Sequence, residues 1–163
     1  MPGLRCALML ALFGGALVAQ PAPVAVGLLG GESVRALATR LEASRPGAVR
    51  AIQGIDAVGK AKPKLVLFVV NAPDGPMPAN REALKFMSQA GIKNFAIVFT
   101  GTMQIHDPEL FGLIVGEVVD LVKQAGLPGD QVPVFLDSDT IKTDPQLKLR
   151  KGIASLQEYI EKS

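Results

Sequence analysis

One segment of the sequence has residue types and a spacing that could bind an anion. Gly30-Gly31 stands between a short apolar run and a stretch with helical spacing that starts at Ser33. Free amides at a helix N-terminus attract phosphate or carboxylate groups even without a lysine. The glycine spacing is not that of a Rossmann fingerprint. Glycine pairs also make plain tight turns before helices, and we favour that interpretation over a weak anion site.

No other set of side chains has the spacing of a catalytic or metal site. The chain has one cysteine, Cys6, and one histidine, His106, which has no partner at metal-ligand spacing. Asp137 and Asp139 alternate after an apolar run and are interpreted as loop caps rather than as an acid–base pair. We therefore expect no catalytic residue and no metal ligand.

The elements that would position Gly30 and Gly31 alternate between apolar runs and amphipathic stretches. Four buried strands are predicted, over residues 24–29, 65–70, 94–100 and 132–136. Helices are predicted over residues 33–43, 78–90 and 108–125, and from Asp144-Pro145 to about residue 160. The pattern predicts an α/β fold of three layers, with a mainly parallel sheet of about four strands and helices on both faces.

Residues 48–60 predict at best a weak helix, because Gly54 and Gly59 interrupt it. In the helix over residues 108–125, the side chains expected to face the core are Leu110, Leu113, Ile114, Val118, Leu121 and Val122.

Residues 1–19 have the layout of a secretory signal peptide. Arg5 precedes an apolar run of 14 residues, 6–19, that ends in Leu17-Val18-Ala19. This run is shorter than the roughly 20 residues of a membrane-spanning helix. We expect cleavage before Gln20 and an extracytoplasmic domain, periplasmic or secreted, over residues 20–163. An uncleaved membrane anchor is the alternative.

Composition and charge indicate one folded domain. Apolar residues make up 48% of the chain and charged residues 20%, with a net charge of +2. This balance gives no general attraction to nucleic acid or to an anionic membrane. The first half is more basic, and its cations form either a solvated surface, which we favour, or a mildly basic face for an acidic partner. They are Arg35, Arg40, Arg45, Arg50, Lys60, Lys62 and Lys64.

One segment resembles a turn that is specific to a protein family. It consists of residues 71–84, Asn-Ala-Pro-Asp-Gly-Pro-Met-Pro-Ala-Asn-Arg-Glu-Ala-Leu. The turn follows the fourth strand in the GTP-binding domain of elongation factor Tu. The similarity continues over residues 95–134, more loosely over 152–160, and in outline over 24–43. It implies a P-loop NTPase-like fold with a reduced strand count. Residues 44–63 are too few for the family's switch region, its second and third strands and its Asp-x-x-Gly turn.

The nucleotide-binding motifs of that family are all altered here. The phosphate loop falls on residues 30–37, which lack its lysine and carry Glu32 instead. The guanine-reading Asn-Lys-x-Asp falls on residues 101–104, and Ser-Ala-Leu falls on residues 138–140. The degenerate phosphate-loop positions are thus Gly30, Gly31 and Ser33, and the degenerate base-recognition positions are Gly101, Thr102, Gln104 and Ser138. The resemblance implies that GTP and magnesium are not cofactors and that GTPase activity is absent.

The resemblance also suggests a contact surface. In elongation factor Tu the turn and helix corresponding to residues 73–90 contact the nucleotide exchange factor. Met77, Asn80 and Leu84 could therefore form a protein-contact patch, although a structural role for this turn is favoured. The predicted strand over residues 24–29 is expected at the sheet edge, where it could pair with a partner or in a homodimer.

We therefore expect a non-catalytic, exported GTPase-like domain that acts as a protein-binding or scaffolding module. One alternative is a GTP-binding protein like the elongation factor, with residual nucleotide binding. A second is a small-ligand-binding module that uses the crevice at the carboxyl ends of the strands, near Gly30, Asn71, Thr100 and Asp137.

Overall fold

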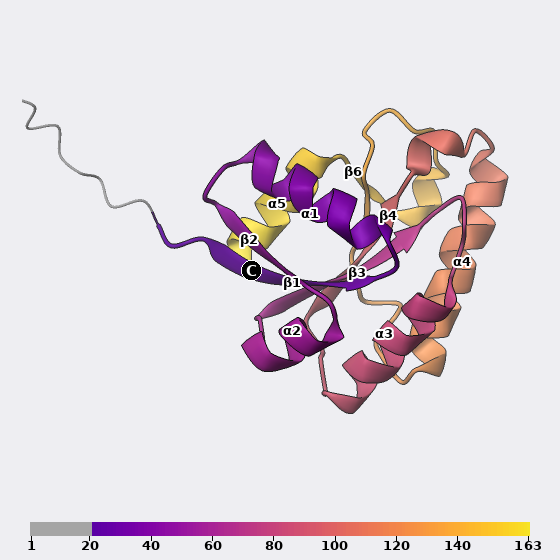
Figure 1. Ribbon diagram of the computed structural model, residues 1–163. Helices are drawn as coiled ribbons and strands as arrows, with labels where there is room; N and C mark the ends of the chain where they lie inside the picture. Colours follow the sequence, from indigo (N-terminus) through magenta and orange to yellow (C-terminus); the bar gives the residue numbers. More distant parts are fainter. Residues whose placement is uncertain (1–20) are drawn as a thin grey trace, which may run out of the picture.

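The computed structural model describes residues 21–163, and the predicted signal peptide lies outside them (Figure 1). In the described residues a single sheet of six parallel strands has the order β2-β1-β3-β4-β5-β6. The strands are β1 (Val24–Gly30), β2 (Val49–Gln53), β3 (Leu65–Asn71), β4 (Phe95–Thr100), β5 (Val134–Leu136) and β6 (Arg150–Lys151). The α/β class and the parallel sheet predicted from the sequence are confirmed.

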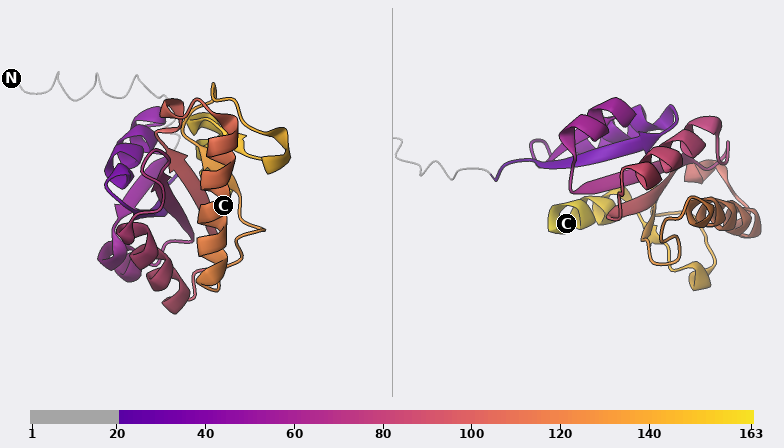
Figure 2. Two further views of the ribbon diagram at one scale, coloured as in Figure 1. Left: turned by 90° about the vertical axis from the view of Figure 1, so that its right-hand side faces the viewer. Right: turned by 90° about the horizontal axis from the view of Figure 1, so that it is seen from below.

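Helices cover both faces of this sheet (Figure 2). They are α1 (Ser33–Ser44), α2 (Ile55–Ala61), α3 (Pro78–Gln89), α4 (Pro108–Gln124) and α5 (Ile153–Lys162), with short 3₁₀ turns η1 (Thr102–Gln104) and η2 (Pro145–Leu147). Side chains of α1 and α5 form one apolar cluster with the sheet, and those of α2, α3 and α4 form the other. No helix in residues 21–163 is both long and apolar enough to span a membrane.

The central strands are the unbroken apolar runs that the sequence displays. All six residues of β4 are buried, and so are the first six of β3. A strand with helices on both faces excludes water from both sides, which is why these runs show no alternation. β3 and β4 pair from Val66 opposite Phe95 to Asn71 opposite Thr100, so they end at the same level.

The predicted strand count was too low, and the weak helix over residues 48–60 was wrong. Residues 49–53 form β2, which pairs in parallel with β1, and only residues 55–61 form a helix. Gly54, at φ +90°, separates strand from helix rather than interrupting a helix. As a result β1 lies between β2 and β3, and the prediction that it forms the sheet edge was also wrong.

The buried face of α4 agrees with the predicted one only in part. Val118 and Val122 are buried as predicted, and Ile114 and Leu121 pack partly buried against the core. Phe111 and Val115 are also buried, whereas the predicted Leu110 and Leu113 are exposed. Both stripes have helical spacing, because the first half of this helix is apolar on most sides. Periodicity alone could not choose between them. Asp107 caps this helix and accepts hydrogen bonds from the amides of Glu109 and Leu110.

The predicted C-terminal helix starts later than expected. Asp144 accepts a hydrogen bond from the amide of Gln146 at 2.9 Å, but it caps only the single turn η2. Lys148, at φ +50°, ends that turn, and Arg150 and Lys151 then pair with Phe135 and Leu136 at the sheet edge. The last helix, α5, begins at Ile153, and its buried positions include Leu156 and Ile160.

We predict that Gly30 tolerates no side chain. Its φ is +154°, and a Cβ there would lie 2.2 Å from the backbone oxygen of Val69 on the adjacent strand. Because that oxygen belongs to the sheet and cannot move aside, Gly30→Ala should lower the free energy of unfolding by about 2–3 kcal/mol. Urea denaturation followed by circular dichroism measures this change.

Gly31→Ala is the matched control, since a Cβ at Gly31 meets no atom of the described residues within 4 Å. Its unfolding free energy should stay within about 0.5 kcal/mol of the parent value. Equal destabilisation by both substitutions would contradict this explanation of Gly30.

Candidate functional site

The sheet has a topological switch point between β1 and β3. The chain leaves β1 through α1, on one face of the sheet, and leaves β3 through α3, on the opposite face. The two βα loops therefore diverge and leave a gap at the carboxyl ends of the strands. Open parallel sheets bind their ligands at such points.

A crevice of about 850 Å³ occupies this switch point. This volume lies within the roughly 300–1,000 Å³ of typical small-molecule sites. The β1–α1 loop contributes Gly30, Gly31, Glu32 and Ser33, and the β3–α3 loop contributes Asn71, Asp74, Met77, Pro78, Ala79 and Asn80. The three phosphate-loop positions predicted from the sequence are thus together on one wall.

The opposite wall is held by Asn80, which is 2% exposed. Its Nδ2 donates to the carbonyl of Val69 at 2.8 Å, and its Oδ1 accepts from the amide of Met77 at 2.9 Å. These bonds tie the first turn of α3 to β3 and place Met77, 47% exposed, at the crevice. Pro78 starts the helix, as predicted.

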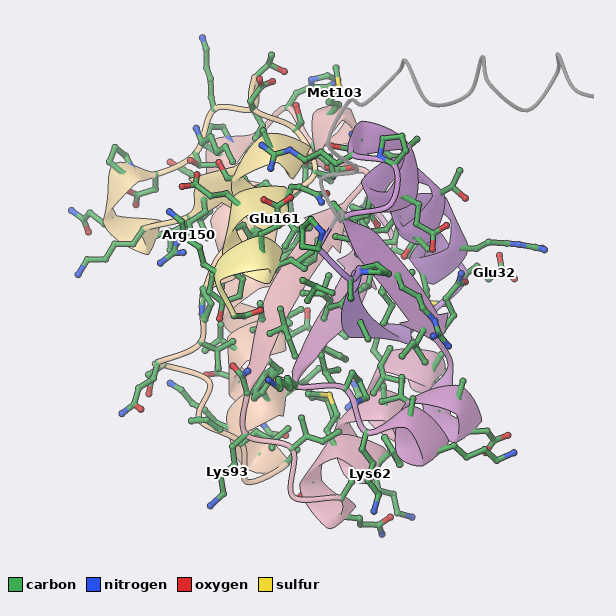
Figure 3. All side chains as sticks on the ribbon, turned by 90° about the vertical axis from the view of Figure 1, so that its left-hand side faces the viewer. Glu32, Lys62, Lys93, Met103, Arg150 and Glu161 are labelled. Carbon is green, nitrogen blue, oxygen red and sulfur yellow. The ribbon has the colours of Figure 1, made fainter. Side chains whose placement is uncertain are left out.

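The polar groups of the crevice are acidic or neutral. Asn71 Nδ2 donates to Asp74 Oδ2 at 2.6 Å, and Glu32 projects outward at the rim (Figure 3). The buried Ser33 Oγ has no hydrogen-bond partner among the described residues. Within residues 21–163 the crevice lining contains no lysine or arginine. It therefore presents two carboxylates with no balancing cation.

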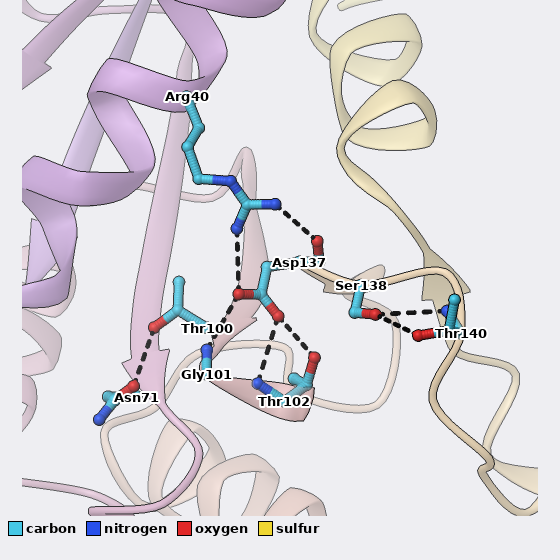
Figure 4. Close-up of polar contacts among 8 residues, drawn as sticks. All are labelled: Arg40, Asn71, Thr100, Gly101, Thr102, Asp137, Ser138 and Thr140. Carbon is cyan, nitrogen blue, oxygen red and sulfur yellow. Dashed lines mark hydrogen bonds and ion pairs between the residues drawn. The ribbon is translucent and has the colours of Figure 1, made fainter. Parts of the chain in front are cut away.

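The neighbouring part of the same sheet edge, between β4 and β5, is closed by Asp137 (Figure 4). Its carboxylate accepts from the amides of Gly101 at 3.0 Å and Thr102 at 3.3 Å, and from Thr102 Oγ1 at 2.5 Å. Arg40 of α1 donates to the same carboxylate and to the Asp137 carbonyl, each at 3.1 Å. Four donor groups from two segments thus converge on one side chain that is 11% exposed.

This network uses the groups at the predicted base-recognition positions. The amides of Gly101 and Thr102 are already bonded, while Gln104 is exposed. Ser138 is buried, and its Oγ bonds to the hydroxyl and amide of Thr140. The structure therefore brings two of the four predicted positions, Gly101 and Thr102, to the Asp137 carboxylate, which the sequence had suggested only as a loop cap.

Asn71 links the closed part of the edge to the open crevice. Its Oδ1 accepts from Thr100 Oγ1 at 3.3 Å, next to the Asp137 network, while its Nδ2 holds Asp74 in the crevice. Gly101 faces it directly, because a Cβ on Gly101 would lie 2.6 Å from Asn71 Oδ1. Of the four residues that the sequence placed near a ligand crevice, Gly30 and Asn71 line it, whereas Thr100 and Asp137 lie in the closed part of the edge.

The predicted protein-contact patch is not on the surface as a unit. Met77 is exposed, but Asn80 and Leu84 are 2% and 4% exposed. Asn80 fixes α3 to β3, and Leu84 packs into the apolar cluster beneath α3. Only Met77 of the three residues is available to a partner.

Two side chains away from the crevice have shifted pKa values. A hydrogen bond to Asp130 raises the pKa of Lys123, and a hydrogen bond from Lys162 lowers the pKa of Glu158. Neither residue lines the crevice. The described residues contain no group of three or more histidine, cysteine, aspartate or glutamate side chains placed to hold a metal ion.

No protein-family model matches the sequence, so the function is inferred from the residues of the site. A guanine nucleotide with magnesium does not fit the residues that line the crevice. The described lining offers no lysine or arginine to its phosphates and carries Glu32 and Asp74 instead.

We predict that Asp137 is the main polar anchor of this edge. In Asp137→Ala two amides, one hydroxyl and Arg40 lose their acceptor. Charge-assisted bonds to a largely buried carboxylate are strong, so the free energy of unfolding should fall by about 2–3 kcal/mol. Urea denaturation provides the measurement.

Asp139→Ala serves as the control, because Asp139 is exposed and lies two residues away. Its effect should stay within about 0.5 kcal/mol. If Asp137→Ala lowered the free energy of unfolding no more than Asp139→Ala, the network would not stabilise this edge.

Proposed function

We propose that this protein is a non-catalytic binding module that holds a small uncharged or cationic molecule in the β1–β3 crevice. The observation that carries the proposal is the open crevice at the switch point, beside a β4–β5 edge that Asp137 closes. A smaller pocket of about 400 Å³ lies at the same edge, beside the ends of β1 and β2, and the crevice between α1 and α3 is about twice its volume.

The charge of the lining supports the ligand class. Glu32, Asp74 and the oxygen of Asn71 can accept hydrogen bonds from hydroxyl or amino groups, and Met77 offers an apolar surface. The amides at the start of α1 act in the opposite direction, since a helix N-terminus favours an anion by about 0.3–1 kcal/mol. Two carboxylates without a cation outweigh that contribution, so the crevice favours a hydrogen-bond donor over a phosphate.

The other functional hypotheses have less support. Two of the three residues predicted to form a protein-contact patch, Asn80 and Leu84, are buried. A partner that adds a strand would have to pair at β2 or β6, the outer strands of the described sheet, rather than at β1. The elongation factor Tu-like origin and the export of the domain remain part of the proposal, resting on the sequence alone.

Filling the crevice should abolish ligand binding. A Cβ at Gly31 meets no described atom within 4 Å, so Gly31→Leu can place its side chain in the crevice without distorting the fold. We expect at least one of adenosine, guanosine, glucose and spermidine to bind the full-length parent chain saturably. Gly31→Leu should weaken that binding by about tenfold or more. Ligand-observed NMR at millimolar ligand measures both.

Gly116→Leu is the matched control, because Gly116 is exposed on α4 and a Cβ there also meets no described atom within 4 Å. It should bind like the parent. The proposal fails if none of the four compounds binds, or if Gly31→Leu and Gly116→Leu behave alike. Saturable binding of GDP with magnesium that Gly31→Leu removes would favour the nucleotide alternative instead.

A further inference from the structure

A second pocket lies at the opposite edge of the sheet, where β3 and β4 begin. It has a volume of about 450 Å³ and lies between the end of α2 and the turn that joins α3 to β4. Val58, Phe86 and Ile92 give it an apolar floor. Nothing in the proposed function uses this pocket.

Three lysines surround this apolar floor. Lys62 and Lys64 come from the loop before β3, and Lys93 comes from the loop before β4. Figure 3 shows Lys62 and Lys93 at the same end of the molecule. None of the three forms an ion pair with another described residue, and the part of the pocket lining within residues 21–163 contains no aspartate or glutamate.

Two other cations of the predicted basic stretch form ion pairs elsewhere. Arg40 is paired with Asp137, and Arg45 is paired with Glu161. The cations of the predicted basic face therefore lie at separate places. Two of those without an ion pair, Lys62 and Lys64, lie at this pocket together with Lys93. An apolar cavity whose rim carries only positive charge is complementary to a molecule with an anionic head and an apolar body.

The backbone around the pocket is fixed in place. Asn94 Nδ2 donates to the carbonyl of Lys64 at 2.7 Å, which ties the two lysine-bearing loops together. A Cβ on Gly27 of β1 would lie 2.9 Å from Pro63 Cγ and 3.1 Å from Val58 Cγ2, so the end of α2 packs closely on the sheet. The pocket is thus preformed, which lowers the cost of ordering its walls on binding.

Two residues that line this pocket are unfavourable for the local backbone structure. Lys62 adopts the left-handed conformation, φ +47° and ψ +58°, at the C-cap of α2, where glycine is the favoured residue. Gly59 lies inside α2, where glycine weakens a helix, and its missing side chain leaves the ring of Phe86 uncovered. Backbone strain of this kind concentrates at functional sites.

We propose that this pocket binds a single-chain amphipathic anion, with its carboxylate or sulfonate among Lys62, Lys64 and Lys93 and its apolar part against Phe86 and Ile92. The site is independent of the β1–β3 crevice, so either proposal can fail without the other.

The test uses anilinonaphthalene sulfonate as a fluorescent probe on the full-length chain, with decanoate below its micellar concentration as a competitor. We expect saturable fluorescence enhancement that decanoate reverses. Lys62→Gly combined with Lys64→Gln and Lys93→Gln should weaken decanoate binding about tenfold, because it removes all three rim charges. Gly59→Leu should weaken it as well, since a Cβ there already lies 3.5 Å from Phe86 Cζ and a longer side chain fills the pocket.

Lys148→Gly is the matched control. Lys148 is the other described non-glycine residue with a positive φ, +50°, and it does not line the pocket. It should bind decanoate like the parent chain. Thermal unfolding of every variant verifies the fold, and Lys62→Gly alone should be at least as stable as the parent because glycine removes the strain.

Three results would overturn the proposal. The first is equal decanoate affinity in the parent and the pocket variants. The second is a loss of affinity in Lys148→Gly as large as that in the triple variant. The third is competition by phosphatidylglycerol vesicles but not by monomeric decanoate, which would indicate a membrane surface rather than a pocket ligand.

Discussion

The Asp137 carboxylate is the interaction on which the carboxyl edge of this sheet depends. It joins α1, through Arg40, to the loop after β4, through Gly101 and Thr102, although these segments are 97 and about 36 residues away in sequence. Free amides and a guanidinium in this position could bind an anionic ligand. Here the carboxylate of the chain's own aspartate accepts their hydrogen bonds instead. The β4–β5 end is therefore structural, and the binding that we propose is at the β1–β3 end.

The strand order also places the two pockets at opposite edges of the sheet. Because β1 and β3 are neighbours whose helices pack on opposite faces, the loops that leave them diverge and form the crevice at their junction. The amino edge carries the second pocket, between the loops that precede β3 and β4. The two cavities have opposite charge, with Glu32 and Asp74 in the first and three lysines around the second. A parallel sheet separates them by the length of its strands, so the two ligands that we propose would bind independently.

The sequence predicted most of the elements that have strong local signals. The runs that form β3 and β4 are apolar throughout, and Asp107 and Pro78 mark the helix starts that the structure has. β2 was missed because an outer strand with only Val49 fully buried has no long apolar run, and its signal depends on pairing with β1. The role of Asp137 was missed for a similar reason, since its donors lie far away in sequence. Both failures concern long-range contacts, which local patterns do not encode.

Amide hydrogen exchange of Gly101 and Thr102 in the full-length chain, followed by NMR, tests the central claim most directly. The account requires that both amides remain bonded to the Asp137 carboxylate in the resting protein. It predicts exchange at least about a hundredfold slower than in an unstructured peptide, corresponding to an opening free energy of about 3 kcal/mol. Exchange at the unstructured rate would mean that the β4–β5 end is open, and the division of this edge into a structural part and a binding part would be wrong.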